Sequence, residues 1–505
     1  MRNLDTPVKQ IRRKIFTEIA KIGFESTDES LIHDIESIPY NIVEERAKYR
    51  ESIYRERAVA SERVRLAMGL SLRPENRSVH LTDGVKASNI DEKYYEPPLM
   101  QVIPSACSAC ESNKYEVSNM CRGCVAHPCL LTCPKGAISM VNGKSFIDQD
   151  KCIHCGRCKA VCPYDAIAHK ERPCERACGV KAIESDEQGR ASINQDKCVS
   201  CGMCMVSCPF GAISDKSQIF QTIRAIQSGE KVYAAVAPAF VGQFGPKVTP
   251  GKLRAAMKAL GFADVFEVAI GADLCAKQEA EDFLKEVPDE LPFMATSCCP
   301  AWSVMAKKLF PEHAKCISMA LTPMTLTARL IKQHNPDARV VFIGPCAAKK
   351  LEAMRRSVRS EVDFVLTFEE MTGIFSAKHV DLENIEEDPA GVSDASTDGR
   401  NFAVAGGVAQ AVVNVIKRDH PDQEIKVANA EGLKECRQLL KLATLGKYPG
   451  YLLEGMACPG GCVAGAGTMQ AIKKSQTSVG LYAKQSTHKT SSETEYIKEL
   501  DKLVD

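Results

Sequence analysis

The stretch Glu454-Gly-Met-Ala-Cys-Pro-Gly-Gly-Cys-Val-Ala-Gly-Ala-Gly467 places two cysteines four residues apart in a turn rich in glycine and proline. Two further segments have the same character, Thr296-Ser-Cys-Cys-Pro-Ala-Trp302 and Pro345-Cys-Ala-Ala-Lys-Lys350. Beside glycine and proline the backbone turns sharply and can approach an inorganic cluster closely. More than 40 residues separate successive segments, so the fold has to bring the thiols together. Thiolates gathered in this way suit iron and sulfide.

The composition limits the class of protein. The chain has 505 residues, enough for two to four domains, and its 65 basic and 64 acidic residues leave a net charge of +1. This balance gives no support for a nucleic-acid partner or an anionic membrane surface. No apolar run approaches the roughly 18–20 residues that span a bilayer, and the first residues have no apolar core like that of a secretory signal. We therefore expect a cytoplasmic protein.

Cysteine use points to metal rather than to disulfides. Of the 24 cysteines, 16 lie between Cys107 and Cys208, most of them in CxxC runs. This region also carries an internal repeat, because the phrase Cys-x-x-x-Ala-Ile begins at Cys133, Cys162, Cys178 and Cys208. Each copy is typical of one half of a ferredoxin-like unit.

Two of the four repeats have the full spacing CxxCxxCxxxCP, which starts at Cys152 and at Cys198. In this motif three thiolates bind one 4Fe–4S cube and the fourth binds the cube of a partner repeat. Zinc does not need such an interlocked pattern. The first repeat has one wider gap, and the third keeps only Cys174 and Cys178, while an unassigned CxxC stands upstream at Cys107 and Cys110.

We expect four 4Fe–4S clusters, paired by analogy with four-repeat ferredoxins so that repeat one pairs with four and repeat two with three. The predicted ligand sets are Cys121, Cys124, Cys129 with Cys208; Cys198, Cys201, Cys204 with Cys133; Cys152, Cys155, Cys158 with Cys178; and Cys107, Cys110, Cys174 with Cys162. An alternative has three clusters, with Cys107 and Cys110 unliganded or structural.

The rest of the chain predicts a multidomain α+β and α/β protein. Residues 1–100 lack cysteine and are expected to form a helical N-terminal segment, in which residues 41–70 are rich in helix formers whose charged face we expect to be solvated. Residues 101–215 form the ferredoxin-like domain with four half-repeats. Residues 216–505 alternate short apolar strands, such as Lys231–Ala237 and Val340–Ile343, with helices. Ligand-bearing loops are expected at the ends of such strands.

The three cysteine segments quoted above resemble the signature loops of the iron-only (FeFe) hydrogenases, and they occur in the same order. The resemblance covers roughly residues 218–505 and, with the ferredoxin repeats, about four-fifths of the chain. It implies an H-cluster, a 4Fe–4S cube joined through a cysteine sulfur to a diiron unit that carries CO, cyanide and a bridging dithiolate. By motif position the ligands of the cube are Cys299, Cys346, Cys458 and Cys462, with Cys462 as the bridging thiolate.

Further residues take their roles from the same resemblance. Lys349 matches a lysine that pairs with one cyanide, and the backbone at Ala237-Pro238 matches the loop that meets the other. Met456 and Phe402 match side chains packed against the diiron unit. The proton relay corresponds to Cys298, Glu279, Ser318 and Asp282, with Asp282 standing where a glutamate is usual.

The chain departs from well-studied members at positions that would line the diiron pocket. Gly344, Met324 and Ala239 stand where methionine, glutamine and serine are common, and Ala466-Gly-Thr468 replaces Gly-Gly-Gln. This pattern of residues is similar to that of the branch of the iron-only hydrogenases called group B.

The resemblance implies reversible interconversion of protons and dihydrogen, with electrons passed along 4Fe–4S clusters to a ferredoxin-like carrier and with maturation proteins building the diiron unit. The alternatives are a hydrogen sensor and an iron–sulfur assembly protein of the hydrogenase-like family. Such assembly proteins generally lack the lysine loop and the full third loop, so Lys349 and Met456 argue against that alternative. A plain polyferredoxin leaves the last 290 residues unexplained.

Overall fold

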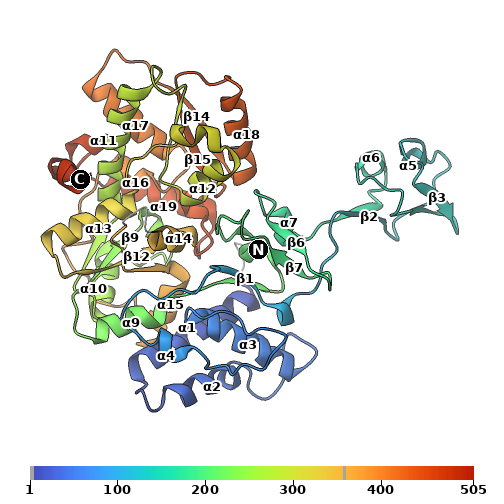
Figure 1. The fold of residues 1–505 in the computed structure, drawn as a ribbon, viewed down its shortest axis with the longest axis horizontal. Coiled ribbons are helices and arrows are strands. Elements are labelled where there is room, and N and C mark those ends of the chain that lie inside the picture. Colours follow the sequence, from blue (N-terminus) through green and yellow to red (C-terminus); the bar gives the residue numbers. More distant parts are fainter. Residues whose placement is uncertain (1–4, 356–359, 505) are drawn as a thin grey trace.

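Two parallel sheets form the centre of the molecule (Figure 1). The computed structural model describes residues 5–355 and 360–504. The first sheet has the order β10-β9-β12-β13 and the second the order β11-β15-β14, and every neighbouring pair is parallel. The strands are β9 (Val232–Val236), β10 (Asp264–Glu267), β11 (Met294–Ala295), β12 (Arg339–Gly344), β13 (Phe364–Thr367), β14 (Lys426–Glu431) and β15 (Tyr451–Met456). β9 and β12 are almost wholly buried, which explains their continuous apolar sequences.

Helices surround both sheets. They are α9 (Ile219–Gln227), α10 (Pro250–Ala259), α11 (Ala269–Glu286), α12 (Pro300–Leu309), α13 (Pro323–His334), α14 (Ala348–Met354), α15 (Phe368–Ala377), α16 (Thr397–Asn401), α17 (Gly407–Asp419), α18 (Leu433–Thr444), α19 (Ile472–Lys484) and α20 (Leu500–Val504). Short 3-10 turns are η2 (Pro238–Phe240), η3 (Pro311–Cys316), η4 (Cys462–Ala464), η5 (Ser491–Glu493) and η6 (Glu495–Glu499).

The N-terminal helices share the core of the first sheet. They are α1 (Pro7–Glu25), α2 (Leu31–Ile42), α3 (Ile53–Ala67) and α4 (Val85–Ser88). Thr6 caps α1 through a hydrogen bond from the Lys9 amide, and α1 packs on α9 and α15. Ile15 and Ile19 of α1 belong to the same hydrophobic cluster as the strands β9 and β12. The segment therefore joins the α/β part of the molecule as an extra helical layer.

The prediction that residues 41–70 form helix was only partly right. Helix α3 lies within this range, but α2 ends at Ile42 and the helical path resumes only at Ile53, after Ser52 caps the new helix. The prediction of a solvated charged face was wrong. Glu62, Arg63 and Arg65 of α3 are buried because neighbouring segments cover the helix.

The cysteine-rich region divides into two lobes. The distal lobe contains β2 (Lys114–Val117), α5 (Pro128–Leu131), β3 (Ile138–Val141), β4 (Lys144–Ile147), α6 (Arg157–Ala160) and β5 (Ile167–Lys170). The proximal lobe contains β1 (Met100–Val102), η1 (Pro104–Ala106), α7 (Pro173–Arg176), β6 (Ile183–Ser185), β7 (Ala191–Ile193), α8 (Met203–Ser207) and β8 (Ile213–Asp215). The antiparallel pairs are β2–β5 and β3–β4 in the distal lobe, and β1–β8 and β6–β7 in the proximal lobe.

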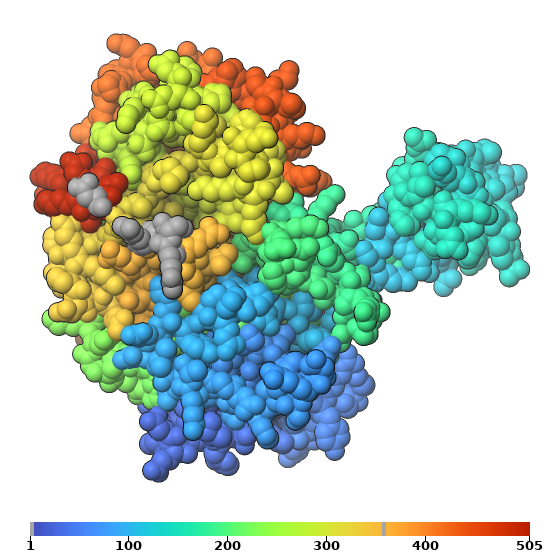
Figure 2. Space-filling model, in the orientation of Figure 1, coloured from blue at the N-terminus to red at the C-terminus, as the bar shows by residue number. Residues whose placement is uncertain are grey.

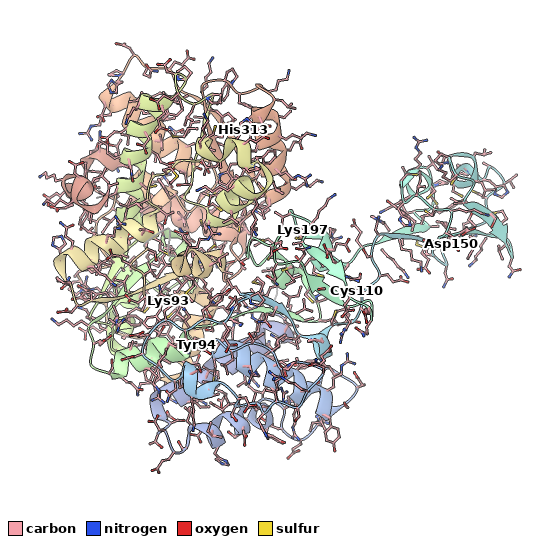
Figure 3. All side chains as sticks on the ribbon, in the orientation of Figure 1. Lys93, Tyr94, Cys110, Asp150, Lys197 and His313 are labelled. Atoms are coloured by element: carbon pink, nitrogen blue, oxygen red, sulfur yellow. The ribbon has the colours of Figure 1, made fainter. Side chains whose placement is uncertain are left out.

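The distal lobe stands apart from the body, whereas the proximal lobe lies against it (Figure 2). Asp150 marks the distal lobe and Cys110 lies near the narrow connection to it (Figure 3). Among the described residues, no helix combines the length and apolar character that crossing a membrane requires.

The predicted fold class is confirmed, with helices, ferredoxin-like repeats and an α/β catalytic half. The division at residues 100 and 215 stays a proposal. The C-terminal tail reads in sequence as a polar segment after Thr468 followed by a helix from about Ser491 to Leu503. The structure differs in both parts, because helix α19 follows Thr468 and the last segment consists mainly of the 3-10 turns η5 and η6 before α20.

Candidate metal centres and catalytic site

The three cysteine segments meet at one cavity of about 80 Å³. Each segment follows the carboxyl end of a parallel strand, namely β11, β12 and β15. Because β11 and β15 belong to one sheet and β12 to the other, the cavity lies where the ends of the two sheets face each other. The cysteines in its wall are Cys298, Cys299, Cys346, Cys458 and Cys462, together with Cys201 of the proximal lobe.

Glycine is required where the third loop closes over this cavity. Gly461 has φ +92°, and a Cβ atom there would lie 2.5 Å from the Ala405 amide nitrogen. The amide of Gly460 donates to Oε2 of Glu431 at 2.6 Å, which holds the loop between Cys458 and Cys462 in place. Both thiols are thereby presented from one tight turn.

The thiols are buried close to one another. Burial is the main cause that raises the pKa of Cys299, of Cys346 (to about 11) and of Cys462. Cys299 raises the pKa of the other two, and Cys346 also raises that of Cys462. Such a group needs nearby positive charge to exist as thiolates, and iron supplies it. The donor set therefore fits an iron–sulfur cube.

Lys349 brings a buried cation to the same cavity. Its Nζ lies 2.8 Å from Oε2 of Glu352, so the two form an ion pair. Burial acts to lower the pKa of this ammonium group, but the charge of Glu352 and a hydrogen bond to it raise the pKa overall, and Lys349 forms part of the cavity wall. An ammonium group has three N–H donors and Glu352 accounts for one of them, so an anionic acceptor within the cavity would fit beside Lys349.

The remaining wall is mainly apolar. Met324, Phe402, Met456 and the Ala237-Pro238 backbone all line the cavity, as predicted from the sequence. Ala239 and Gly465 line it as well, whereas Thr468 does not. These groups keep water away from whatever the cavity holds.

Phe342 also lines the cavity, and the sequence reasoning missed it. A Cβ at Gly344 would lie 2.5 Å from the Phe342 ring, so the ring occupies the space beside that glycine. Residues two apart on a strand face the same side, so the alternation along β12 was the signal that could have found it.

The four residues predicted for the proton relay lie close together, and Cys298 among them lines the cavity. Cys298 faces the cavity, and burial followed by the charge of Glu279 raises the pKa of this thiol. Glu279 is fully buried in α11 and accepts a hydrogen bond from the Ser297 amide at 3.2 Å. Burial raises the pKa of Glu279 to about 7.

The outer half of this path involves Ser318 and Asp282. Ser318 lowers the pKa of the Glu279 carboxyl, although Oε2 of Glu279 has no hydrogen bond of good geometry among the described residues. Asp282 is half-buried one helical turn further along α11, and its charge raises the pKa of Glu279. The structure therefore brings the four predicted relay residues into one neighbourhood.

The distal lobe brings together repeats one and two. The thiols of Cys121, Cys124 and Cys129 share one small pocket with Cys162, and those of Cys152, Cys155 and Cys158 share another with Cys133. The expected pairing of repeat one with four was wrong. The ladder β2–β5 ties the end of repeat two to the start of repeat one, so the fourth cysteine of each repeat reaches its neighbour in sequence.

The proximal lobe brings together repeats three and four. Cys178 raises the pKa of Cys201 and of Cys204, and Cys208 raises that of Cys110 and of Cys174. The expected pairing of repeat two with three was therefore also wrong. The sets that the fold assembles are Cys198, Cys201, Cys204 with Cys178, and Cys107, Cys110, Cys174 with Cys208.

All four repeats share one local contact. In each Cys-x-x-x-Ala phrase the alanine amide donates to the sulfur four residues earlier, at 3.3 Å for Cys133, 3.4 Å for Cys162, 3.1 Å for Cys178 and 3.3 Å for Cys208. Amide donors of this kind stabilise thiolates. Among the described residues, no group of three or more His, Cys, Asp or Glu is arranged to hold a single metal ion.

The proximal lobe touches the catalytic cavity directly. Cys201 lies in the cavity wall, and the charge of Cys346 acts on its thiol. A Cβ at Gly202 would lie 2.5 Å from the Cβ of Ala466, which shows how closely the two backbones approach. The proximal lobe therefore lies between the distal lobe and the cavity.

Comparisons with known proteins agree with this architecture. A family described as "Iron only hydrogenase large subunit, C-terminal domain" matches residues 230–466, and the 4Fe-4S binding domain matches residues 146–168 and 191–214. Iron hydrogenase 1 of Clostridium pasteurianum is 30% identical over 388 residues, which cover 66% of this chain and 67% of that protein. The periplasmic Fe hydrogenase large subunit of Nitratidesulfovibrio vulgaris is 30% identical over 375 residues, or 64% of this chain and 85% of that one.

The fold and the thiol-lined cavity define an iron–sulfur protein with a buried cavity between its two parallel sheets. The chain belongs to the iron-only hydrogenase family and carries a ferredoxin-like region on the N-terminal side of the hydrogenase domain.

More distant similarities also exist. The nuclear prelamin A recognition factor of Homo sapiens is 25% identical over 284 residues, which cover 46% of this chain and 62% of that protein. A solved structure of an FeFe-hydrogenase from Chlamydomonas reinhardtii is 24% identical, covers 54% of this chain and 89% of that one, and superposes with a TM-score of 0.46.

Proposed function

We propose that this protein is an FeFe hydrogenase that reversibly oxidises dihydrogen and reduces protons. The observation that carries the proposal is the cavity in which Cys299, Cys346, Cys458 and Cys462 meet beside the buried ammonium group of Lys349. These four thiols would hold the cube of an H-cluster, and Cys462 would also bind the diiron unit. When bound, that cofactor supplies the site at which dihydrogen is split or formed and the electrons are exchanged.

The chain itself supplies orientation, a dry environment and a route for protons. Lys349 would donate a hydrogen bond to a cyanide ligand and fix the orientation of the diiron unit. Met324, Met456, Phe402 and the Ala237-Pro238 backbone exclude water from the cavity. The apolar wall also removes competing polar ligands for the metal.

Proton transfer would run from Cys298 to Glu279 and outward by Ser318 and Asp282. The thiol lies in the cavity wall, and the carboxyl behind it has a pKa of about 7, so it can both accept and release a proton near neutrality. The relay thus starts at the cavity and ends at a half-exposed carboxyl.

Electrons would pass through four 4Fe–4S clusters, two in each lobe. The four sets of four thiols support this number over three, because Cys107 and Cys110 fall beside Cys174 and Cys208. The distal lobe, which protrudes from the body, is the expected docking place of a ferredoxin-like carrier (Figure 2). Maturation proteins would be needed to build the diiron unit.

An assembly role is the second candidate, because relatives include the cytosolic iron-sulfur assembly component 3 of Pongo abelii, 26% identical over 285 residues. Infrared spectroscopy of the matured protein separates the two. A hydrogenase shows CO and cyanide bands together with dihydrogen uptake, and an assembly protein shows neither.

The expected cytoplasmic location also remains a proposal, since one relative is titled periplasmic. Fractionation of the source cells tests it, and recovery with periplasmic markers would overturn it.

A further inference from the structure

A second cavity, of about 400 Å³, lies where the N-terminal helices meet the proximal lobe and the loop at residues 465–468. Its size falls within the roughly 300–1,000 Å³ typical of small-molecule sites. It is not the chamber of an iron–sulfur cluster. Cys208 forms part of its wall, but Cys107, Cys110 and Cys174, the other thiols of that set, do not line it.

The wall carries excess positive charge, with six basic and two acidic side chains. Both carboxylates already have partners. Oε1 of Glu56 accepts from the amides of Lys48 at 3.0 Å and Arg50 at 2.8 Å, and Glu369 pairs with Arg12. The chain therefore leaves most of this charge without a counter-ion of its own.

Arg63 is the buried basic residue of this wall whose charge has no ion-pair partner in the part of the chain that the structure describes. Its side chain is buried, with the residue 6% exposed, and one Nη donates to the Gly211 carbonyl. The other Nη has no hydrogen-bond partner, and Arg63 forms no ion pair among the described residues. Nε of Arg12, a residue that is 8% exposed, also lacks a partner. Arg12 already has Glu369 as a counter-ion, whereas the buried guanidinium group of Arg63 has none within the described ranges, and such a group is costly unless an anion pairs with it.

The shape of a guanidinium group indicates which anion fits. Its planar fork matches the paired oxygens of a phosphate or a carboxylate. The same cavity has an apolar side formed by residues such as Ile11, Val43 and Val59. An occupant therefore needs both an anionic group and an apolar part.

We propose that this cavity binds a small organic anion, whose phosphate or carboxylate group pairs with Arg63 and Arg12 and whose apolar part lies against Val43 and Val59. If the proposed function holds, the occupant sits beside the Cys208 end of the electron relay, so it can regulate electron flow from a place remote from the catalytic cavity.

Isothermal titration calorimetry of the anaerobically purified full-length protein tests the binding itself. The probes are ADP, octanoate and inorganic pyrophosphate, with adenosine as the neutral control. We expect ADP, octanoate or both to bind at one site per chain, and adenosine not to bind. ADP without octanoate assigns the site to phosphates, and octanoate without ADP assigns it to carboxylates. Pyrophosphate measures the contribution of the anionic group alone.

Two variants locate the site. Arg63→Met should weaken the binding constant about tenfold or more, since a charge-assisted hydrogen bond is lost. Arg46→Gln removes a charge from an exposed side chain of the cavity wall that makes no hydrogen bond or ion pair among the described residues, so it tests the site without disturbing the fold. We expect it to weaken binding severalfold, whereas the exposed Arg77, outside the cavity, should tolerate Arg77→Gln unchanged.

The proposal is overturned if neither organic anion binds, or if affinity is the same in the wild type, Arg63→Met and Arg46→Gln. If Arg63→Met does not fold, the affinity of Arg46→Gln relative to the wild type decides whether the proposal holds. Because the titration requires no turnover, a chain that binds the anion but lacks hydrogenase activity would refute the proposed function and leave this site intact.

Discussion

At the scale of single residues, Cys298 and Cys299 are neighbours with different tasks. Cys299 joins the set of four thiols, while Cys298 faces the cavity from its proton side, beside Glu279. We expect Cys298→Ala to lower hydrogen turnover about 10²–10⁴-fold, the usual contribution of a positioned proton-transfer group. Turnover is measured with a dye as electron partner, and iron content is measured in parallel.

The control for this change is Cys316→Ala, which removes a fully buried thiol that lies outside the cavity wall. It should retain turnover. Full activity in Cys298→Ala, with iron content unchanged, would remove the proposed relay but leave the metal assignment standing.

Glu279 gives a second test at the same scale. Its pKa of about 7 lies above the ordinary value near 4.3, because burial penalises the ionised form. A carboxyl with a raised pKa contributes stability that is complete below pH of about 4 and is lost as pH rises through about 7. We expect Glu279→Gln to flatten this part of the stability curve and to lower turnover at least 100-fold.

Chemical unfolding at several pH values checks the first effect, and dye-linked turnover checks the second. A Gln variant that keeps the wild-type pH dependence of stability would show that another group titrates there.

At the scale of elements, helix α14 ties the proximal lobe to the catalytic half. Lys350 in this helix is buried, with Nζ 2.8 Å from Asp215 of β8 and 2.8 Å from Glu370 of α15. Lys350→Met would leave two buried carboxylates without their cation. We expect the free energy of unfolding to fall by about 3–5 kcal/mol.

Denaturant unfolding of the apo-protein measures this loss. The comparison is Lys502→Met, which breaks an exposed pair with Glu499 and should cost no more than about 1 kcal/mol. Equal small effects of both substitutions would contradict the structural role of Lys350.

Element by element, sequence reasoning succeeded where local pattern determines structure. The buried strands β9 and β12 and the cysteine loops after β12 and β15 were predictable, because apolar runs that end in Pro or Gly are local signals. The pairing of the cysteine repeats could not be predicted from the sequence. Cys133, Cys162, Cys178 and Cys208 stand in nearly identical phrases, so only long-range strand pairing such as β2–β5 shows which thiol meets which.

The same limit explains two other misses. The charges of α3 look solvated in sequence, yet Arg63 is buried because the end of repeat four covers it. Phe342 looks like an ordinary core residue, and its place in the cavity wall depends on the glycine two positions later.

At the scale of the whole molecule, we expect that the distal lobe can be removed without unfolding the rest of the protein. Lys114 and Lys170 are paired across the β2–β5 ladder, so the chain enters and leaves the lobe at adjacent points. Replacing residues 114–170 with a short Gly-Ser linker should remove two clusters, about eight iron atoms per chain. Turnover with a small dye should persist, while turnover with a ferredoxin-like carrier should fall.

Iron analysis of the excised protein discriminates between pairings. If repeat one paired with four and two with three, excision would disturb every accessory cluster, and about sixteen iron atoms would be lost. That larger loss would refute the lobe assignment.

The central claim is that the thiols of Cys299, Cys346, Cys458 and Cys462 hold an H-cluster in the cavity beside Lys349. Its most direct test is infrared spectroscopy of the anaerobically matured full-length protein under argon and then under dihydrogen. Our account predicts CO and cyanide stretching bands that change when dihydrogen is admitted, and that disappear in Cys462→Ala. A fully matured protein with a complete set of 4Fe–4S clusters but without those bands would contradict it.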